Sequence, residues 1–203
     1  IAVGDILQIE FDASGATKTV TILSLGAASG GGAAAQGDSA NTITEDGTYT
    51  DTVYASSGDD ENALRVDGAT VTLSGVTVEK NAGATSNTEN GDFYGVNAAL
   101  LATGGATLTL KNATVTSSAQ NGNGVFSYGS GTTVNISDST ITTTADNSGG
   151  IQTTGGGTTN ASNLTVSTAG NSSAAIRSDR GGGTVNVTGG SYTSSGYNSP
   201  AVY

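Results

Sequence analysis

The chain has 203 residues, of which 34% are hydrophobic and 5% aromatic, and a formal charge of −11. It contains no Cys, His, Met or Trp, which excludes thiolate and imidazole chemistry and most zinc or transition-metal sites, so we expect no cofactor. The negative charge repels phosphate backbones and no apolar run approaches the ~20 residues that cross a bilayer, so we expect neither nucleic-acid binding nor membrane insertion by this segment.

The first 39 residues differ in composition from the remainder. Residues 1–25 alternate apolar and polar side chains over two stretches, 6–11 and 17–23, on either side of Asp12-Ala-Ser-Gly15. This pattern predicts a β-hairpin, which we interpret as the remnant of a small β-domain. Residues 26–39 are rich in Gly and Ala and predict a flexible linker. The main domain is then expected to span residues 40–203.

One unit recurs five times along this main domain, about every 26 residues. Aligning the copies gives three columns of mostly β-branched residues. The first column is Val71, Leu108, Val134, Thr159 and Val185; the second is Val78, Val115, Ile141, Val166 and Tyr192; the third is Leu64, Leu100, Val125, Ile151, Ile176 and Val202. Three short strands per repeat, each pointing such residues inward, predict an all-β fold: a right-handed parallel β-helix, or solenoid.

The turns between the columns carry their own signals. Asn121, Asn147 and Asn198 lie four residues before the third column, with Asp60 at the matching place in the first coil and Asn171 one residue further away in its own. Because Asn and Asp tolerate left-handed backbone, we predict an asparagine ladder at this turn. Glycine-rich stretches at 129–131, 155–157 and 181–183 predict a second corner.

Three further segments depart from the regular coil. The coil that begins near Asn41, with Tyr49 and Tyr54, is expected to cap the N-terminal end, because an uncapped coil exposes unpaired strand edges. Residues 79–94 are an insertion, which we predict to be an outward loop. At the other end no cap is visible, so we expect the protein to continue past Tyr203, with self-association through this open β-helix edge as the alternative.

The repeats, together with Gly58-Asp-Asp-Glu-Asn-Ala-Leu-Arg-Val-Asp-Gly68, Gly122-Asn-Gly-Val-Phe-Ser-Tyr-Gly129 and Ile176-Arg-Ser-Asp-Arg-Gly181, resemble the adhesin-like surface proteins of Gram-positive bacteria. In those proteins a small β-domain precedes a pectate-lyase-like parallel β-helix. The resemblance covers nearly the whole chain from Asn41 onward. It implies an extracellular location at the cell surface, and it brings no catalytic residues that could be transferred to this chain.

Residues that follow the third column predict a binding surface. Successive strand residues face opposite sides, so the neighbours of the inward residues should point outward. An aromatic, amide and guanidinium stripe suits a sugar, because pyranose rings stack on aromatic faces and their hydroxyls bond to amides and arginine. The alternative is that Leu101 and Phe126 pack under the 79–94 loop. The candidate residues are Arg65, Leu101, Phe126, Gln152, Arg177 and Tyr203, bordered by Phe93, Tyr94 and Tyr128.

Two other clusters of charged residues are weaker candidates. Arg177, Asp179 and Arg180 could serve a polysaccharide lyase, although the neighbouring coils supply no further carboxylates, and a surface ion pair explains them better. Asp59, Asp60 and Glu61 could collect calcium, but contiguous acids point to opposite faces and cannot easily meet one ion. We therefore predict no catalytic residues and no metal site.

The function that these observations favour is a non-enzymatic adhesin or stalk module of a bacterial surface, with a host or neighbouring-cell glycan or protein as partner. A structural, self-assembling fibre subunit is one alternative. A polysaccharide lyase or hydrolase is the enzymatic alternative.

Overall fold

A computed structural model describes residues 6–11, 17–24 and 35–203, which fall into two compact units, 1–35 and 36–203. In the first unit β1 (Ile6–Phe11) and β2 (Thr17–Ser24) pair antiparallel, as the alternation of side chains predicts. Their connecting turn lies outside the described residues. So do residues 26–34 of the predicted linker.

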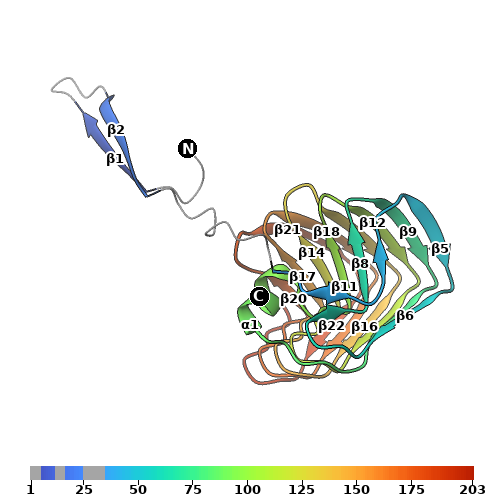
Figure 1. Ribbon diagram of the computed structural model, residues 1–203. Coiled ribbons are helices and arrows are strands. Elements are labelled where there is room, and N and C mark those ends of the chain that lie inside the picture. The colour runs from blue at the N-terminus through green and yellow to red at the C-terminus, as the bar shows by residue number, and fades with distance from the viewer. Residues whose placement is uncertain (1–5, 12–16, 25–34) are drawn as a thin grey trace. The chain divides into compact units, whose positions relative to one another are not determined.

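The second unit is a parallel β-solenoid, made of three parallel six-stranded sheets (Figure 1). Sheet 1 contains β4 (Thr42–Ile43), β8 (Leu64–Asp67), β11 (Leu100–Thr103), β14 (Val125–Tyr128), β17 (Ile151–Thr154) and β20 (Ile176–Ser178). Sheet 2 contains β5 (Gly47–Thr50), β9 (Thr70–Ser74), β12 (Thr107–Lys111), β15 (Thr133–Ser137), β18 (Gly157–Ser162) and β21 (Gly183–Thr188). Sheet 3 contains β6 (Val53–Ser56), β10 (Thr77–Lys80), β13 (Thr114–Ser117), β16 (Thr140–Thr143), β19 (Thr165–Thr168) and β22 (Ser191–Ser194).

The strand register confirms the three predicted columns. In sheet 1 Leu64 pairs with Leu100, and the pairing continues through Val125 and Ile151 to Ile176, which bridges to Val202. Sheets 2 and 3 pair the first and second columns in the same way. Each coil therefore sets its apolar residues directly on those of the neighbouring coils, which keeps the thin core continuous along the axis.

Thr159 and Lys80 are two of the polar residues that are buried in the solenoid. Thr159 occupies a column position that is apolar in the other coils, and its hydroxyl lies 2.7 Å from that of buried Thr153. Lys80 is fully buried; its amine donates to the carbonyl of Gly58 at 2.5 Å and to the hydroxyl of Ser56 at 3.2 Å. Burial lowers the pKa of Lys80, because the interior penalises its charged form. Both groups are buried with hydrogen-bond partners, as the cost of burying polar atoms requires.

The predicted turn stack forms through the backbone. The residues at this turn, Asp60, Asn121, Asn147 and Asn198, all have positive φ. In the coil that contains β20, Ser172 has this conformation rather than Asn171. At the turn the side chain of Asn171 donates to the Asp146 carboxylate at 3.4 Å. A separate amide ladder lies on the outer face of sheet 2, where Asn186 donates to Asn160 at 2.8 Å and Asn160 to Asn135 at 2.9 Å. The turn stack and the amide ladder are thus two separate features.

The coil that begins near Asn41 is the outermost one at the N-terminal end of the described solenoid, and its strands β4, β5 and β6 each have a neighbouring strand on one side only. Tyr54 is buried and Tyr49 packs against the core. The solenoid nevertheless begins before residue 40, because β3 (Asp38–Ser39) pairs in parallel with β7 (Glu61–Asn62). The last residues of the predicted linker are therefore part of the folded unit.

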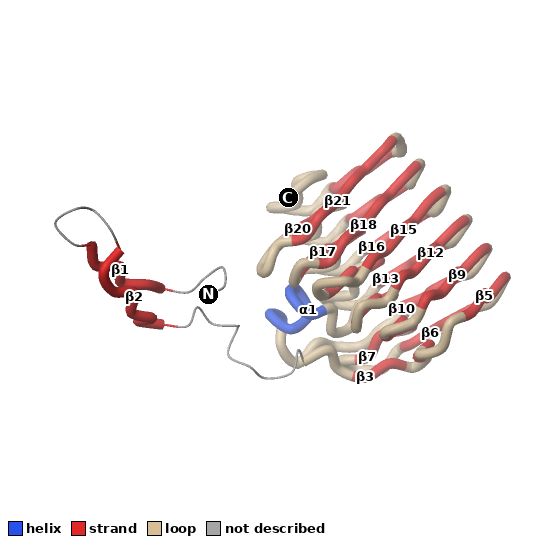
Figure 2. Tube along the Cα trace, turned by 90° about the horizontal axis from the view of Figure 1, so that it is seen from above, coloured by secondary structure: helices blue, strands red, loops and turns tan. Residues whose placement is uncertain are grey.

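The insertion at residues 79–94 differs from the predicted outward loop. It contains a helix, α1 (Thr88–Tyr94), which lies against the side of the stacked coils (Figure 2). Asn87 caps the helix by accepting from the backbone N–H of Asn90, and Gly95 ends it with a φ of 81° that favours glycine. These local caps allow a short helix to form within an all-β chain.

Candidate functional site

Helix α1 covers the outer face of sheet 1, where the binding surface was predicted. Leu101, Phe126 and Gln152 are all 0% exposed. Leu101 and Phe126 form a small apolar cluster of their own with Ala98. The prediction of an open stripe is therefore wrong at these three residues. The alternative of a satellite cluster under the insertion is confirmed, because a docked helix removes their apolar surface from water.

Side chains of two coils hold the helix in place through its backbone and through Asp92. Gln152 donates to the carbonyl of Asp92 at 2.9 Å and Thr154 to that of Phe93 at 2.7 Å. Asn121 donates to the Asp92 carboxylate at 2.9 Å. The C-terminal half of the helix is thus fixed to sheet 1 and to the adjacent turn stack, which determines where the carboxylate of Asp92 points.

Arg177 on β20 faces this carboxylate. Its Nη1 lies 3.5 Å from Oδ1 of Asp92, and its Nη2 lies 2.6 Å from Oδ2 of Asp179. The same guanidinium lies 5.5 Å from the centre of the Tyr203 ring, within cation–π range. Burial raises the pKa of Asp92 above its ordinary value, and the charge of Arg177 opposes part of that shift. The guanidinium is thereby oriented by two carboxylates and one aromatic ring.

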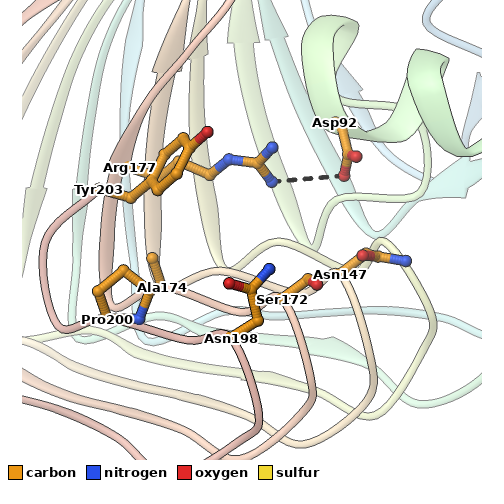
Figure 3. A pocket seen from close by; sticks show the side chains of 8 residues that line it. All are labelled: Asp92, Asn147, Ser172, Ala174, Arg177, Asn198, Pro200 and Tyr203. Carbon is orange, nitrogen blue, oxygen red and sulfur yellow. Dashed lines mark ion pairs between the residues drawn. The ribbon is translucent and has the colours of Figure 1, made fainter.

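A hollow of about 190 Å³ opens beside this ion pair (Figure 3). Its walls combine an acid, a base, amides, a hydroxyl and an aromatic ring, contributed by α1, β20, the turn stack and the last residues of the chain. The lining residues are Asp92, Asn147, Ser172, Ala174, Arg177, Asn198, Pro200 and Tyr203. The arrangement can accept and donate hydrogen bonds around a small polar ligand and stack one face of it.

The other predicted binding residues lie apart from the hollow. Arg65 donates to the backbone carbonyls of residues 36–38 and to Asn62, so it fastens the N-terminal strand segment. Tyr94 and Tyr128 make an edge-to-face pair with centroids 5.6 Å apart. Phe93 lies under the guanidinium of Arg180, at 4.0 Å. Of the predicted residues, only Arg177 and Tyr203 line the hollow.

Asp59, Asp60 and Glu61 each accept a hydrogen bond from a backbone N–H or a hydroxyl group. Asp59 accepts from the N–H of Ala84 and Asp60 from that of Ser86, while Glu61 accepts from the hydroxyl of Ser56. Within the part of the chain that the structure describes, no group of three His, Cys, Asp or Glu residues is placed to hold a metal ion. The first two acids thus hold the start of the insertion.

Sequence reasoning missed Asp92, Asn147, Ser172 and Asn198 as members of one site. Asn147 and Asn198 were recognised as turn residues, and each lies four positions before a third-column residue. Arg177 directly follows such a column residue, so the residue at its position lies a fixed short distance after the turn in every coil. That spacing could have identified the floor of the hollow, but nothing in the sequence places Asp92 above it.

The fold defines the class of this protein as a parallel β-solenoid with a helical insertion on one face. No family model, curated protein or solved structure matches the chain. Among the described residues, no helix is both long enough and apolar enough to span a bilayer.

Proposed function

We propose that this chain is a non-enzymatic binding module of a bacterial cell-surface solenoid protein, an adhesin or stalk, and that it binds a glycan of a host or neighbouring cell in the Arg177 hollow. One observation carries the proposal: amide, hydroxyl and guanidinium groups surround a hollow whose wall includes Tyr203, a ring that is 66% exposed. Sugars bind proteins through this combination of hydrogen bonds and aromatic stacking.

An array of surface glycans tests the proposal. Tyr203→Ala should weaken glycan binding roughly two- to tenfold, because an aromatic stack contributes about 0.5–1.5 kcal/mol. Tyr197→Ala is the matched control, since Tyr197 is 83% exposed in the same coil but does not line the hollow. Equal losses in both variants would place the ligand elsewhere, and the absence of binding to any glycan by the unmodified chain would refute the proposal.

The ion pairs of Arg177 favour binding over catalysis. An arginine that acts as the base of a lyase needs a nitrogen that is free to meet the substrate, whereas Nη1 and Nη2 of Arg177 already face the carboxylates of Asp92 and Asp179. The enzymatic alternative, a polysaccharide lyase or hydrolase, makes a distinct prediction. Release of unsaturated or reducing sugar ends by this chain, abolished in Asp179→Ala, would establish it in place of the binding module.

A second candidate function, axial self-association into a fibre, is favoured by the last coil. Val187 is 39% and Val202 66% exposed there, whereas the residues stacked at equivalent positions in the preceding coil are buried. They border an apolar hollow of about 510 Å³ between the unpaired edge of β21 and residues 201–203, which pair with β20. Such an edge is a template for another strand.

Charge indicates the occupant of this end face, which is the first coil of a second copy. Residues 176–203 carry two arginines and one aspartate, whereas residues 36–56 carry no basic residue and four acids, Asp38, Glu45, Asp46 and Asp51. Opposite charges at the two ends favour a head-to-tail contact, and a contact of that kind does not close on itself but extends into a fibre.

Light scattering of the size-fractionated protein tests this second function. Val187→Lys should yield monomers, because a charge would be buried at the contact. Thr140→Lys, at an exposed position in the middle of sheet 3, is the control and should leave assembly unchanged. An unmodified chain that stays monomeric at high concentration would rule the fibre out.

A further inference from the structure

The backbone carbonyls at the C-terminal end of α1 accept hydrogen bonds from coils on both sides of the insertion. A helix leaves its last four carbonyls without partners inside the helix, so these groups need donors from elsewhere. In addition to the two bonds from β17, the carbonyl of Tyr94 accepts from the side chain of Gln36 at 3.1 Å, and that of Gly95 accepts from Asn62 at 2.8 Å. Gln36 precedes β3 and Asn62 lies in β7, so these two donors belong to the first two coils. The end of the helix is therefore held from both directions along the solenoid axis.

The acidic side chains of the helix reach the coil that contains β20. The Asp92 carboxylate lies 3.5 Å from the guanidinium of Arg177, and that of Glu89 lies 3.4 Å from the guanidinium of Arg180, which also covers the ring of Phe93. Because α1 is inserted just before β11, the coil of β20 lies three coils further along the stack. Strands of the described sheets pair only with strands of adjacent coils. The helix thus makes contacts of a longer range than the sheets do.

The insertion contacts six successive coils, although covering the apolar cluster needs only two of them. Leu101 and Phe126 lie on β11 and β14. At 1.5 Å per residue α1 is about 10 Å long, whereas six stacked coils extend about 24 Å. The outer coils therefore reach the helix through long side chains, Gln36 at one end and Arg180 at the other. An outer coil that moved away would leave helix carbonyls or charges without partners, which is costly where they are buried.

We propose that α1 is an axial strap, which ties six successive coils to one another so that an outer coil does not open without breaking its contacts with the helix. In a solenoid that lacks such an element each coil contacts only its neighbours, and the outer coils open singly. The strap makes the coils from β4 to β20 open nearly together. This role does not depend on whether the hollow binds a glycan, and it suits a stalk, which has to resist peeling along its axis.

Hydrogen exchange of the full chain, at denaturant concentrations below the unfolding transition, tests the proposal. The backbone N–H of Ile151 donates to the carbonyl of Ala175, so it exchanges only when the coil of β20 separates from that of β17. The backbone N–H of Leu100 donates to the carbonyl of Gly124 and reports on the middle of the stack. In the unmodified chain the protection factors of Ile151 and Leu100 should agree within about threefold, because both amides open together.

A double variant, Thr154→Val with Arg180→Gln, removes contacts of two coils with the helix and leaves the pairing of the sheets in place. The protection of Ile151 should then fall at least tenfold relative to that of Leu100, because the coil of β20 can open by itself. An equal change at both amides would overturn the proposal. So would an unmodified chain in which Ile151 is already at least tenfold less protected than Leu100.

Thr143→Val with Lys111→Gln is the matched control. It also removes a buried bond from a threonine hydroxyl to a carbonyl and an exposed basic side chain. The Thr143 hydroxyl, however, bonds to Ser148, which follows five residues later in the chain, and Lys111 lies on the outer face of sheet 2. The ratio of the two protection factors should stay unchanged in this control. A tenfold change of the ratio here as well would mean that the loss does not come from the strap.

Discussion

Asp92 combines burial with charge, and its protonation should therefore influence the stability of the fold. Its pKa is raised above the ordinary value of 3.8 by burial, with Arg177 opposing and Asp179 adding to the shift. A carboxyl whose pKa is higher in the folded chain than in the unfolded chain holds its proton longer when folded. Its contribution to stability is consequently greatest below its ordinary pKa and declines as the pH rises through the raised pKa.

Asp92→Asn should remove this pH dependence. Compared with the unmodified chain, the variant should gain in free energy of unfolding as the pH rises from about 3 to about 7, because its amide does not titrate. Denaturant unfolding at a series of pH values measures the difference. A variant whose relative stability declines over this range would mean that the attraction of Arg177 outweighs the burial of Asp92.

The buried hydroxyl pair of Thr153 and Thr159 allows a second test at single residues. Either Thr→Val substitution alone should cost about 1–3 kcal/mol, since it leaves the partner hydroxyl buried without a hydrogen bond. The double variant should come close to the stability of the unmodified chain, because both polar groups are gone and the shapes are kept. If the loss in free energy of unfolding of the double variant equals the sum of the losses of the two single variants, the two hydroxyls do not stabilise each other.

Helix α1 is the one element that interrupts the regular coil among the described residues. It depends on a close approach to the turn stack, which Gly91 makes possible because it has no side chain. Its apolar support comes from Leu101 and Phe126 below it, where Gly95 also approaches the aromatic ring closely. The helix is therefore specified by small residues on one side and large ones on the other.

Gly91→Ala should force α1 away from Asn121 and destabilise the chain by about 1–3 kcal/mol, as overpacking typically does. Hydrogen exchange should then increase over residues 88–94 while the sheets stay protected. Thr88→Ala, at an exposed site on the same helix, should stay within about 0.5 kcal/mol of the unmodified chain. Unchanged exchange in Gly91→Ala would mean that the helix is not seated closely on the turn stack.

Across the whole molecule, each coil packs mainly on its two neighbours, so stability should depend on position along the axis. Ile141 is buried between two coils, whereas Val185 in the last coil has a neighbour on one side only. Ile141→Ala should cost about 2–5 kcal/mol. Val185→Ala should cost clearly less, as measured by denaturant unfolding. Similar losses at both sites would argue that the solenoid unfolds without regard to neighbouring coils.

The local spacing of residues was sufficient to determine the coil. Strand side chains alternate and parallel strands pair in register, so columns of Val, Leu and Ile at a constant interval can satisfy both requirements only by stacking. The three columns and the positive-φ turns at Asp60, Asn121, Asn147 and Asn198 follow from this alone. Ser172 was missed because serine is a weaker signal for left-handed backbone than asparagine.

Tertiary contacts decided the site. Whether the side chains of Leu101, Phe126 and Gln152 are exposed or covered depends on where the insertion packs. Because the insertion is not part of the repeat, the spacing of the repeat does not predict that position. Likewise, Asp92 meets Arg177 only because α1 docks on a turn stack several coils long. The sequence by itself therefore determined the repeating scaffold, whose contacts link equivalent residues of adjacent coils. The hollow required the structure, because its residues come from non-equivalent places that no local period connects.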